Sequence, residues 1–186
     1  MLSENHFPYI SRKGVKIGEP LKKYSRGISY AADWSSGVDG WVAGNSTATR
    51  LASKSDGATS KNNVIEVEAT VTTNVRFSDY ADSSFGFVGG QRYLVAFSVF
   101  FDAANTTAQG LELRQWSSEG VPGYGAGEAL VNVGDTWLDV SFEFVATGDT
   151  SVGMSFRMTS NSSGGNTNIT VGDKFYLADY AIKSLG

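Results

Sequence analysis

The sequence contains no cysteine among its 186 residues and a single histidine, His6. Without cysteine the chain has no thiol nucleophile, no cysteine-ligated zinc and no disulfide bond. A Ser-His-Asp triad or a histidine-ligated metal would have to use His6, which lies in the basic segment described below. The sequence therefore predicts no cofactor.

Long apolar runs are also absent. No segment approaches the roughly 18 consecutive apolar residues that a membrane span needs. The first eight residues, Met-Leu-Ser-Glu-Asn-His-Phe-Pro, have no apolar stretch of the kind that a secretion signal carries. We therefore expect a protein made in the cytoplasm of its host cell, without a secretion signal and without membrane contact.

Basic and acidic residues are segregated along the chain. Residues 1–27 carry six Lys/Arg against two acids, a net charge of +4, whereas residues 28–186 carry nine against 17, a net charge of −8. This division predicts an extended basic anchoring arm at 1–27 and a folded domain at 28–186. We expect the arm to bind an acidic protein surface rather than nucleic acid, which the acidic body would repel. The residues assigned to anchoring are Arg12, Lys13, Lys16, Lys22, Lys23 and Arg26, together with Phe7, Tyr9 and Tyr24.

The body alternates apolar and polar residues with a period of two. Such alternation is typical of half-buried strands in antiparallel sheets, and clusters of Gly, Ser, Asn and Asp separate the alternating segments. Nothing in the body indicates a helix longer than one turn. The pattern predicts an all-β, two-sheet antiparallel sandwich. Its expected core contains Val95, Phe97, Val99, Val140, Phe142, Phe144, Met154 and Phe156.

One predicted strand, residues 110–116, carries the best candidate ligand-binding residue. Leu111 and Leu113 should face the core, so Glu112, Arg114 and Trp116 should face outward. An aromatic side chain beside charged groups on a polar face suggests a platform for stacking a sugar. The alternatives are a contact between subunits, which would make the protein a homo-oligomer, and a tryptophan covered by a loop. Two further aromatics, Tyr80 and Tyr124, could join a binding site with Trp116.

Paired carboxylates are the only catalytic arrangement that the sequence offers. Glu112 and Glu143 both project from the outward faces of predicted strands. If those strands were neighbours, the two acids could form a glycosidase-like pair. Acids on a polar sheet face are usually solvated, however, and Arg114 would pair with one of them. We therefore expect a protein that is not an enzyme.

Four segments resemble the jelly-roll carbohydrate-binding modules of families 4, 9 and 22, which have a galactose-binding-like fold. They are residues 33–41 (Asp-Trp-Ser-Ser-Gly-Val-Asp-Gly-Trp), 89–97 (Gly-Gly-Gln-Arg-Tyr-Leu-Val-Ala-Phe), 133–144 (Val-Gly-Asp-Thr-Trp-Leu-Asp-Val-Ser-Phe-Glu-Phe) and 174–182 (Lys-Phe-Tyr-Leu-Ala-Asp-Tyr-Ala-Ile). The resemblance implies a jelly-roll sandwich from about residue 28 to the end of the chain. It also implies a structural role for Trp34, Trp41 and Trp137.

The chain departs from this family where the family holds a structural calcium ion. Ser35 follows Trp34 where the family often has Glu, and the paired acids of the last strand are reduced to Asp179. Asp33 and Asp179 are the remaining candidate metal ligands.

The resemblance leaves two functions open, because this jelly roll also occurs in virion proteins of tailed bacteriophages. Our main prediction is a non-catalytic structural virion protein, a capsid-decorating or cementing module or a tail-associated one. Its basic arm would dock onto other virion proteins, and its location would be the virion. The alternative is a carbohydrate-binding module that attaches to glycans through its surface aromatics.

Overall fold

A computed structural model describes residues 29–78, 87–115, 119–120, 130–131, 134–148, 154–160 and 167–186. The basic arm and the three candidate aromatics Tyr80, Trp116 and Tyr124 lie outside these ranges. All regular structure within them is β-strand, which confirms the predicted all-β class. No helix long and apolar enough to cross a membrane occurs in the part of the chain that the structure describes.

Six antiparallel strands form the first sheet, sheet A, in the order β10-β6-β12-β4-β3, with β1 also paired to β12. The strands follow the alternating segments of the sequence. Their bounds are β1 (Ser29–Ala31), β3 (Ser46–Ser55), β4 (Ser60–Ala69), β6 (Arg92–Phe101), β10 (Leu138–Val145) and β12 (Lys174–Ser184).

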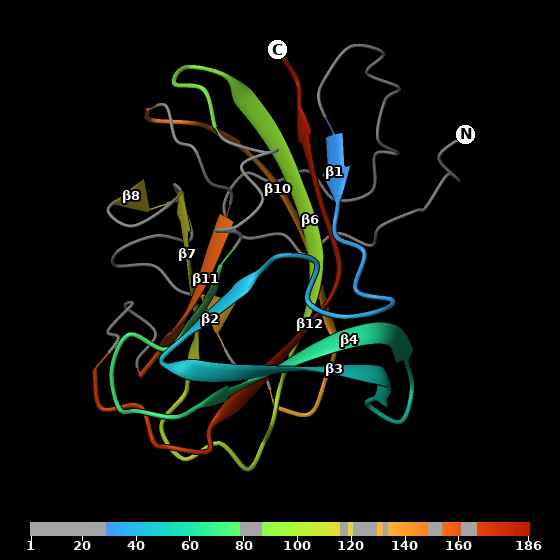
Figure 1. Cartoon of the computed structure of the whole chain (residues 1–186), viewed down its shortest axis with the longest axis vertical. Helices are drawn as coiled ribbons and strands as arrows, with labels where there is room; N and C mark the ends of the chain where they lie inside the picture. Colours follow the sequence, from blue (N-terminus) through green and yellow to red (C-terminus); the bar gives the residue numbers. More distant parts are fainter. Residues whose placement is uncertain are drawn as a thin grey trace.

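Six strands form the second sheet, sheet B, in the order β2-β5-β11-β7-β8, with β9 also paired to β7. In Figure 1, β7, β8 and β11 stand to the left of β6 and β1 of sheet A. The two sheets make the predicted sandwich. The bounds in sheet B are β2 (Val42–Gly44), β5 (Arg76–Ser78), β7 (Gly110–Gln115), β8 (Glu119–Gly120), β9 (Leu130–Val131) and β11 (Met154–Thr159).

The core lies between the sheets and contains all eight residues predicted for it. Aromatic rings join the two layers: Phe97 of sheet A packs edge-on against Phe156 of sheet B, with ring centroids 4.9 Å apart. Trp41, just before β2, contacts Phe77 and Phe156 of sheet B and Tyr180 of sheet A, at centroid distances of 5.1, 5.8 and 4.8 Å. Trp34 and Trp41 are therefore buried packing residues.

Strand β12 contains a β-bulge. Its pairing with β6 shifts between Ala178 and Ala181, so one extra residue is accommodated. The inward-facing residues are Phe175 and Leu177 before the bulge and Tyr180 and Ile182 after it. Asp179, with a positive φ of 56°, is the residue at which the alternation changes phase.

A second apolar cluster covers the outer face of sheet A, and the sequence did not predict it. It contains Val64, Phe100, Trp137, Tyr176 and Ala178, with Leu51 packed against it. Trp137 belongs to this outer cluster and not to the core between the sheets. Its side chain is nevertheless only 7% exposed, because the β3–β4 hairpin folds over it. The Lys54 ammonium lies 4.2 Å from the ring centroid of Phe100 and 3.9 Å from that of Tyr176.

The connection from sheet A to sheet B, residues 102–109, is held by one buried carboxylate. Asp173, 3% exposed, accepts hydrogen bonds from the backbone N–H groups of Thr106, Thr107 and Ala108 at 2.7, 3.0 and 2.7 Å. Burial by itself raises the pKa of Asp173. The three N–H groups favour the charged form more strongly, so its pKa lies below the ordinary value of 3.8.

We expect Asp173→Asn to lower the free energy of unfolding by about 2 kcal/mol at pH 7, because the charge-assisted hydrogen bonds are lost. A lowered pKa contributes stability above pH 3.8 that disappears as the pH falls through the folded-state value. The deficit of the variant should therefore shrink below pH 3.8. Thermal unfolding between pH 2.5 and pH 7 measures both effects. A deficit that is equal at all pH values would contradict the assignment.

Candidate functional site

The outer face of sheet B carries two rows of mostly polar residues across its central strands. Phe77, Leu113 and Phe156 face the core, so their strand neighbours face away from it. Backbone pairing aligns these neighbours in two rows. We call the set the arginine face; its rows are Gly44–Arg76–Arg157–Glu112 and Ser78–Ser155–Arg114, each running from strand to paired strand.

Glu112 lies at the centre of this face and is completely buried. The sequence correctly placed it on the outward side of the strand, but the expectation that it is solvated is wrong. Its Oε1 accepts a hydrogen bond from Arg114 Nη2 at 2.7 Å, as predicted for Arg114, and its Oε2 lies 3.8 Å from Arg157 Nη1. Burying a carboxylate is costly unless cations pair with it, and these two arginines supply the pairing.

Arg76 and Arg157 occupy directly opposed positions on β5 and β11. Two like charges in such positions repel each other. Their side chains lean apart: Arg157 reaches toward Glu112 of β7, whereas Arg76 lies over Gly44 of β2. A Cβ atom on Gly44 would come within 2.6 Å of Arg76 Nε, so glycine leaves the space that this arginine fills.

The neighbouring row is neutral apart from Arg114. Ser78 and Ser155 are both buried, and their hydroxyl oxygens share a hydrogen bond of 2.6 Å. The side chains of Arg114 and Arg157 are 15% and 12% exposed. The described part of the face thus presents two arginines at its rim and a buried polar floor.

The charge of the arginine face is opposite to that of the body around it. It contains three arginines and one glutamate, a net charge of +2, whereas residues 28–186 together carry −8. Burial strengthens the field of these charges because water screens them less. Such an arrangement can donate several hydrogen bonds to oxygen atoms of a ligand while attracting negative charge.

The carboxylate pair considered from the sequence does not form. Glu112 lies on β7 of sheet B, whereas Glu143 lies on β10 of sheet A, where it forms an ion pair with Arg92. The two strands are therefore not neighbours, and the two glutamates project from opposite sides of the sandwich.

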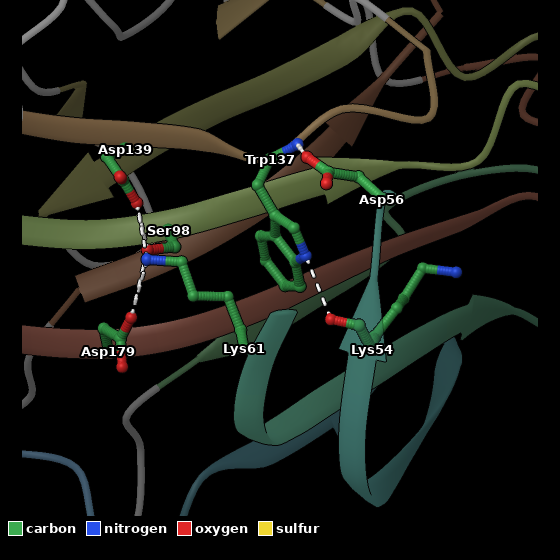
Figure 2. Close-up of polar contacts among 7 residues, drawn as sticks. All are labelled: Lys54, Asp56, Lys61, Ser98, Trp137, Asp139 and Asp179. Carbon is green, nitrogen blue, oxygen red and sulfur yellow. Dashed lines mark hydrogen bonds and ion pairs between the residues drawn. The ribbon is translucent and has the colours of Figure 1, made fainter. Parts of the chain in front are cut away.

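The outer face of sheet A holds a second polar group, shown in Figure 2. Lys61 Nζ donates to Asp139 Oδ1 at 2.9 Å and to Asp179 Oδ2 at 3.0 Å, and the Ser98 hydroxyl lies within hydrogen-bond distance of both oxygens, closer to Asp139. Burial lowers the pKa of Lys61, but the two carboxylates raise it by more. These contacts link the side chain of Lys61 on β4 to β10 and β12. On the same face, Trp137 Nε1 donates a hydrogen bond to the Lys54 carbonyl of β3. The aromatics of this face are covered and cannot stack a ligand.

The two candidate metal ligands each have a protein partner. Asp33 Oδ1 accepts from the backbone N–H of Ser35, whose hydrogen bonds hold the pKa of Asp33 below its ordinary value, and Asp179 accepts from Lys61. No group of three or more His, Cys, Asp or Glu side chains suited to a metal occurs among the described residues. Calcium takes roughly six to eight oxygen ligands, so this donor set does not fit the family's calcium ion.

Sequence analysis identified Glu112 and Arg114 but missed Arg76, Arg157 and Gly44. Both arginines stand at outward positions of alternating segments, Arg76 before Phe77 and Arg157 between Phe156 and Met158. The outward position of each arginine could therefore be predicted from the alternation. Their placement opposite each other and beside Glu112 could not, because the pairing of strands that are distant in sequence is set by the fold.

Comparison with known proteins gives a consistent result for the fold. No protein-family model and no curated protein matches the chain. Among solved structures, the chain is similar to the CBM22-1 xylan-binding domain from Paenibacillus barcinonensis Xyn10C, with a TM-score of 0.51 and 12% identity over 85% of this chain and 93% of that one.

Two further structures show the same likeness. The CBM22-1–GH10 modules of Clostridium thermocellum xylanase 10B, complexed with xylohexaose, match with a TM-score of 0.52 and 15% identity over 85% of this chain and 28% of that one. A mutant of the family 29 carbohydrate-binding module CBM29-2 matches with a TM-score of 0.52 and 11% identity over 87% of this chain and 94% of that one.

These comparisons establish the jelly-roll sandwich of carbohydrate-binding modules as the fold of this chain. They include neighbours from family 22, which the sequence segments resemble. They give no support to our main functional prediction, a bacteriophage virion protein.

Proposed function

We propose that the chain is a non-catalytic carbohydrate-binding module that holds a glycan on the arginine face. The observation that carries the proposal is the cluster of Arg76, Arg157, Arg114 and Glu112 on the outer face of sheet B, partly withdrawn from water. The fold supports it, since the similar structures are described as carbohydrate-binding modules and one of them is complexed with xylohexaose.

The chemistry of the face suits a sugar. Arginine presents several N–H donors in a fixed plane, and hydroxyl and ring oxygens can accept from them. Trp116 follows Arg114 by two residues, so the sequence predicts that its ring belongs to the same face and supplies an apolar platform. Polar donors beside one aromatic ring give a ligand both orientation and buried area.

The proposal is tested by measuring binding to xylohexaose, cellohexaose and an oligogalacturonate by calorimetry. Trp116→Ala should weaken the binding of any recognised glycan by up to about tenfold, because a stacked ring contributes about 0.5–1.5 kcal/mol beyond its buried area. Its melting temperature should stay close to that of the parent.

The matched control is Val171→Ala, which truncates an exposed apolar side chain outside the strands of sheet B and should leave binding unchanged. If Trp116→Ala altered the oligomer mass instead, the tryptophan would lie in a subunit contact, and the expected homo-oligomer would follow. If the parent protein bound no member of a broad glycan panel, the proposal would be wrong.

The basic arm, residues 1–27, adds a separate proposal about attachment. Its net charge of +4 supports docking on an acidic protein surface, with the glycan site on the body left free. A chain that starts at Ile28 should bind glycans as the full chain does and should lose only its salt-sensitive attachment to that partner.

A further inference from the structure

We propose that Lys61 and Asp139 react with each other and form an amide bond between the lysine nitrogen and the aspartate carboxyl carbon. The bond would be a cross-link that the chain makes by itself on the outer face of sheet A, apart from the glycan site proposed above. The structural basis is a single ammonium group held between carboxylates from two other strands. Figure 2 shows Lys61 Nζ between Asp139 and Asp179, with Ser98 beside them.

The reacting groups are already in contact. Lys61 Nζ lies 2.9 Å from Asp139 Oδ1 and 3.0 Å from Asp179 Oδ2. Two strands, β6 and β12, stand between β10 and β4 in sheet A, so the contact spans the outer face of the sheet. Free amines and carboxylates do not condense in water. Holding the two groups together removes the entropy cost of their encounter and gives effective molarities of about 10⁵–10⁸ M in well-oriented reactions.

The two acids have different surroundings, which assign them different roles. The side chain of Asp139 is 21% exposed and that of Asp179 is 46% exposed, so water competes less for the Asp139 carboxyl group. The buried Ser98 hydroxyl lies 2.5 Å from Asp139 Oδ1 and 3.3 Å from Asp179 Oδ2. A hydroxyl placed there can donate to the negative charge that develops on this oxygen during attack. Asp139 is therefore the group attacked, and Asp179 is the base.

The reaction balances without a co-reactant. Burial lowers the pKa of Lys61 and its two carboxylates raise it by more, so the nitrogen starts as an ammonium group. Asp179 takes one proton from it, and the resulting amine attacks the carboxyl carbon of Asp139. The N–C bond forms, a C–O bond breaks, and the oxygen leaves as water with the two protons that the nitrogen has lost. Asp179 ends as the carboxylate that it was at the start.

Mass spectrometry of the intact, folded full chain tests the proposal. After incubation at neutral pH, the mass should be lower than that of the sequence by one water molecule. Tryptic digestion should leave the chain uncut at Lys61 and release a branched peptide that joins the segment around Lys61 to the one around Asp139. Lys61→Arg should keep the full mass, because a guanidinium group preserves the positive charge but is not a nucleophile.

Two further variants test the assigned roles. Asp179→Asn should form the cross-link about a hundredfold more slowly or not at all, because the base is lost while the contact between Lys61 and Asp139 can remain. The matched control is Lys174→Arg. Lys174 also contacts two acids, Glu66 at 3.2 Å and Glu68 at 3.0 Å, and its replacement should leave the loss of water unchanged.

The decisive measurement is made on the parent chain, so it does not depend on how well any variant folds. A parent chain with the full sequence mass and a free Lys61 would overturn the proposal. A loss of water that persists in Lys61→Arg would also overturn it, since dehydration at an Asp-Gly pair such as Asp56-Gly57 lowers the mass equally. A branched peptide that joins Lys61 to Asp179, or an unchanged rate in Asp179→Asn, would overturn the roles assigned to the two acids.

Discussion

Replacing Glu112 by Gln should lower the free energy of unfolding by about 3 kcal/mol or more, because it takes from the partly buried Arg114 and Arg157 the acid that both contact. Glu112 is completely buried and contacts Arg114 and Arg157. Urea denaturation of the variant and the parent measures the loss. Adding Arg157→Gln to the variant should restore part of the lost free energy of unfolding, because it removes one of the two positive charges that Glu112 had balanced.

The same substitution at Glu143 provides the matched control. Glu143 also lies on an outer sheet face and pairs with an arginine, Arg92, but its side chain is 42% exposed. Ion pairs open to solvent contribute about 0–1 kcal/mol, so Glu143→Gln should scarcely change the unfolding midpoint. Equal losses for the two variants would show that burial of the Glu112 pairing has no energetic consequence.

Trp41→Ala should destabilise the sandwich by about 4 kcal/mol. Its indole is buried and contacts the rings of Trp34, Phe77, Phe156 and Tyr180, so its removal opens a cavity between the sheets. The indole Nε1 also donates to the Tyr30 hydroxyl oxygen at 3.1 Å, and that hydroxyl donates to Asp39 at 2.6 Å. Loss of the ring therefore also removes a support for the segment between β1 and β2.

Val42→Ala, at the next residue, is the control for this prediction. Val42 is 42% exposed, so its truncation should change the free energy of unfolding by less than about 0.5 kcal/mol. Thermal and urea unfolding should show a much larger loss of stability for Trp41→Ala than for Val42→Ala. A loss at Trp41 no greater than that at Val42 would mean that the aromatic cluster does not hold the sheets together.

The inward faces of the strands could be predicted from the sequence because alternation is a local property. Phe97, Phe142 and Phe156 each belong to a strand in which every second residue is apolar. Hydrophobic burial turns that apolar set toward the partner sheet. The predicted core and the all-β class are confirmed for this reason. The cover over Trp137 could not be predicted, since it depends on where the β3–β4 hairpin folds in space.

In the site, too, contacts within one strand could be predicted from the sequence, whereas contacts between strands could not. Arg114 was expected to pair with a glutamate, and it does, because Glu112 stands two residues before it on the same face. The partner from the neighbouring strand, Arg157, is separated from Glu112 in sequence and meets it only through strand register. The proposed pairing of Glu112 with Glu143 failed because alternation gives the face of a residue but not its sheet.

The bulge in β12 bears on how the length of this strand can change without disturbing the core. Before the bulge the inward-facing residues have odd numbers, as Leu177 does, and after it they have even numbers, as Tyr180 does. If Asp179 were removed and the strand became regular, both residues would still face inward. Loss of a single residue at this position is therefore compatible with every downstream contact of β12 with β1 and β6, at the expense of one partner of Lys61. Loss of one residue from regular β6 would turn part of its core residues to the surface. Insertions and deletions among homologous chains should accordingly collect at this bulge.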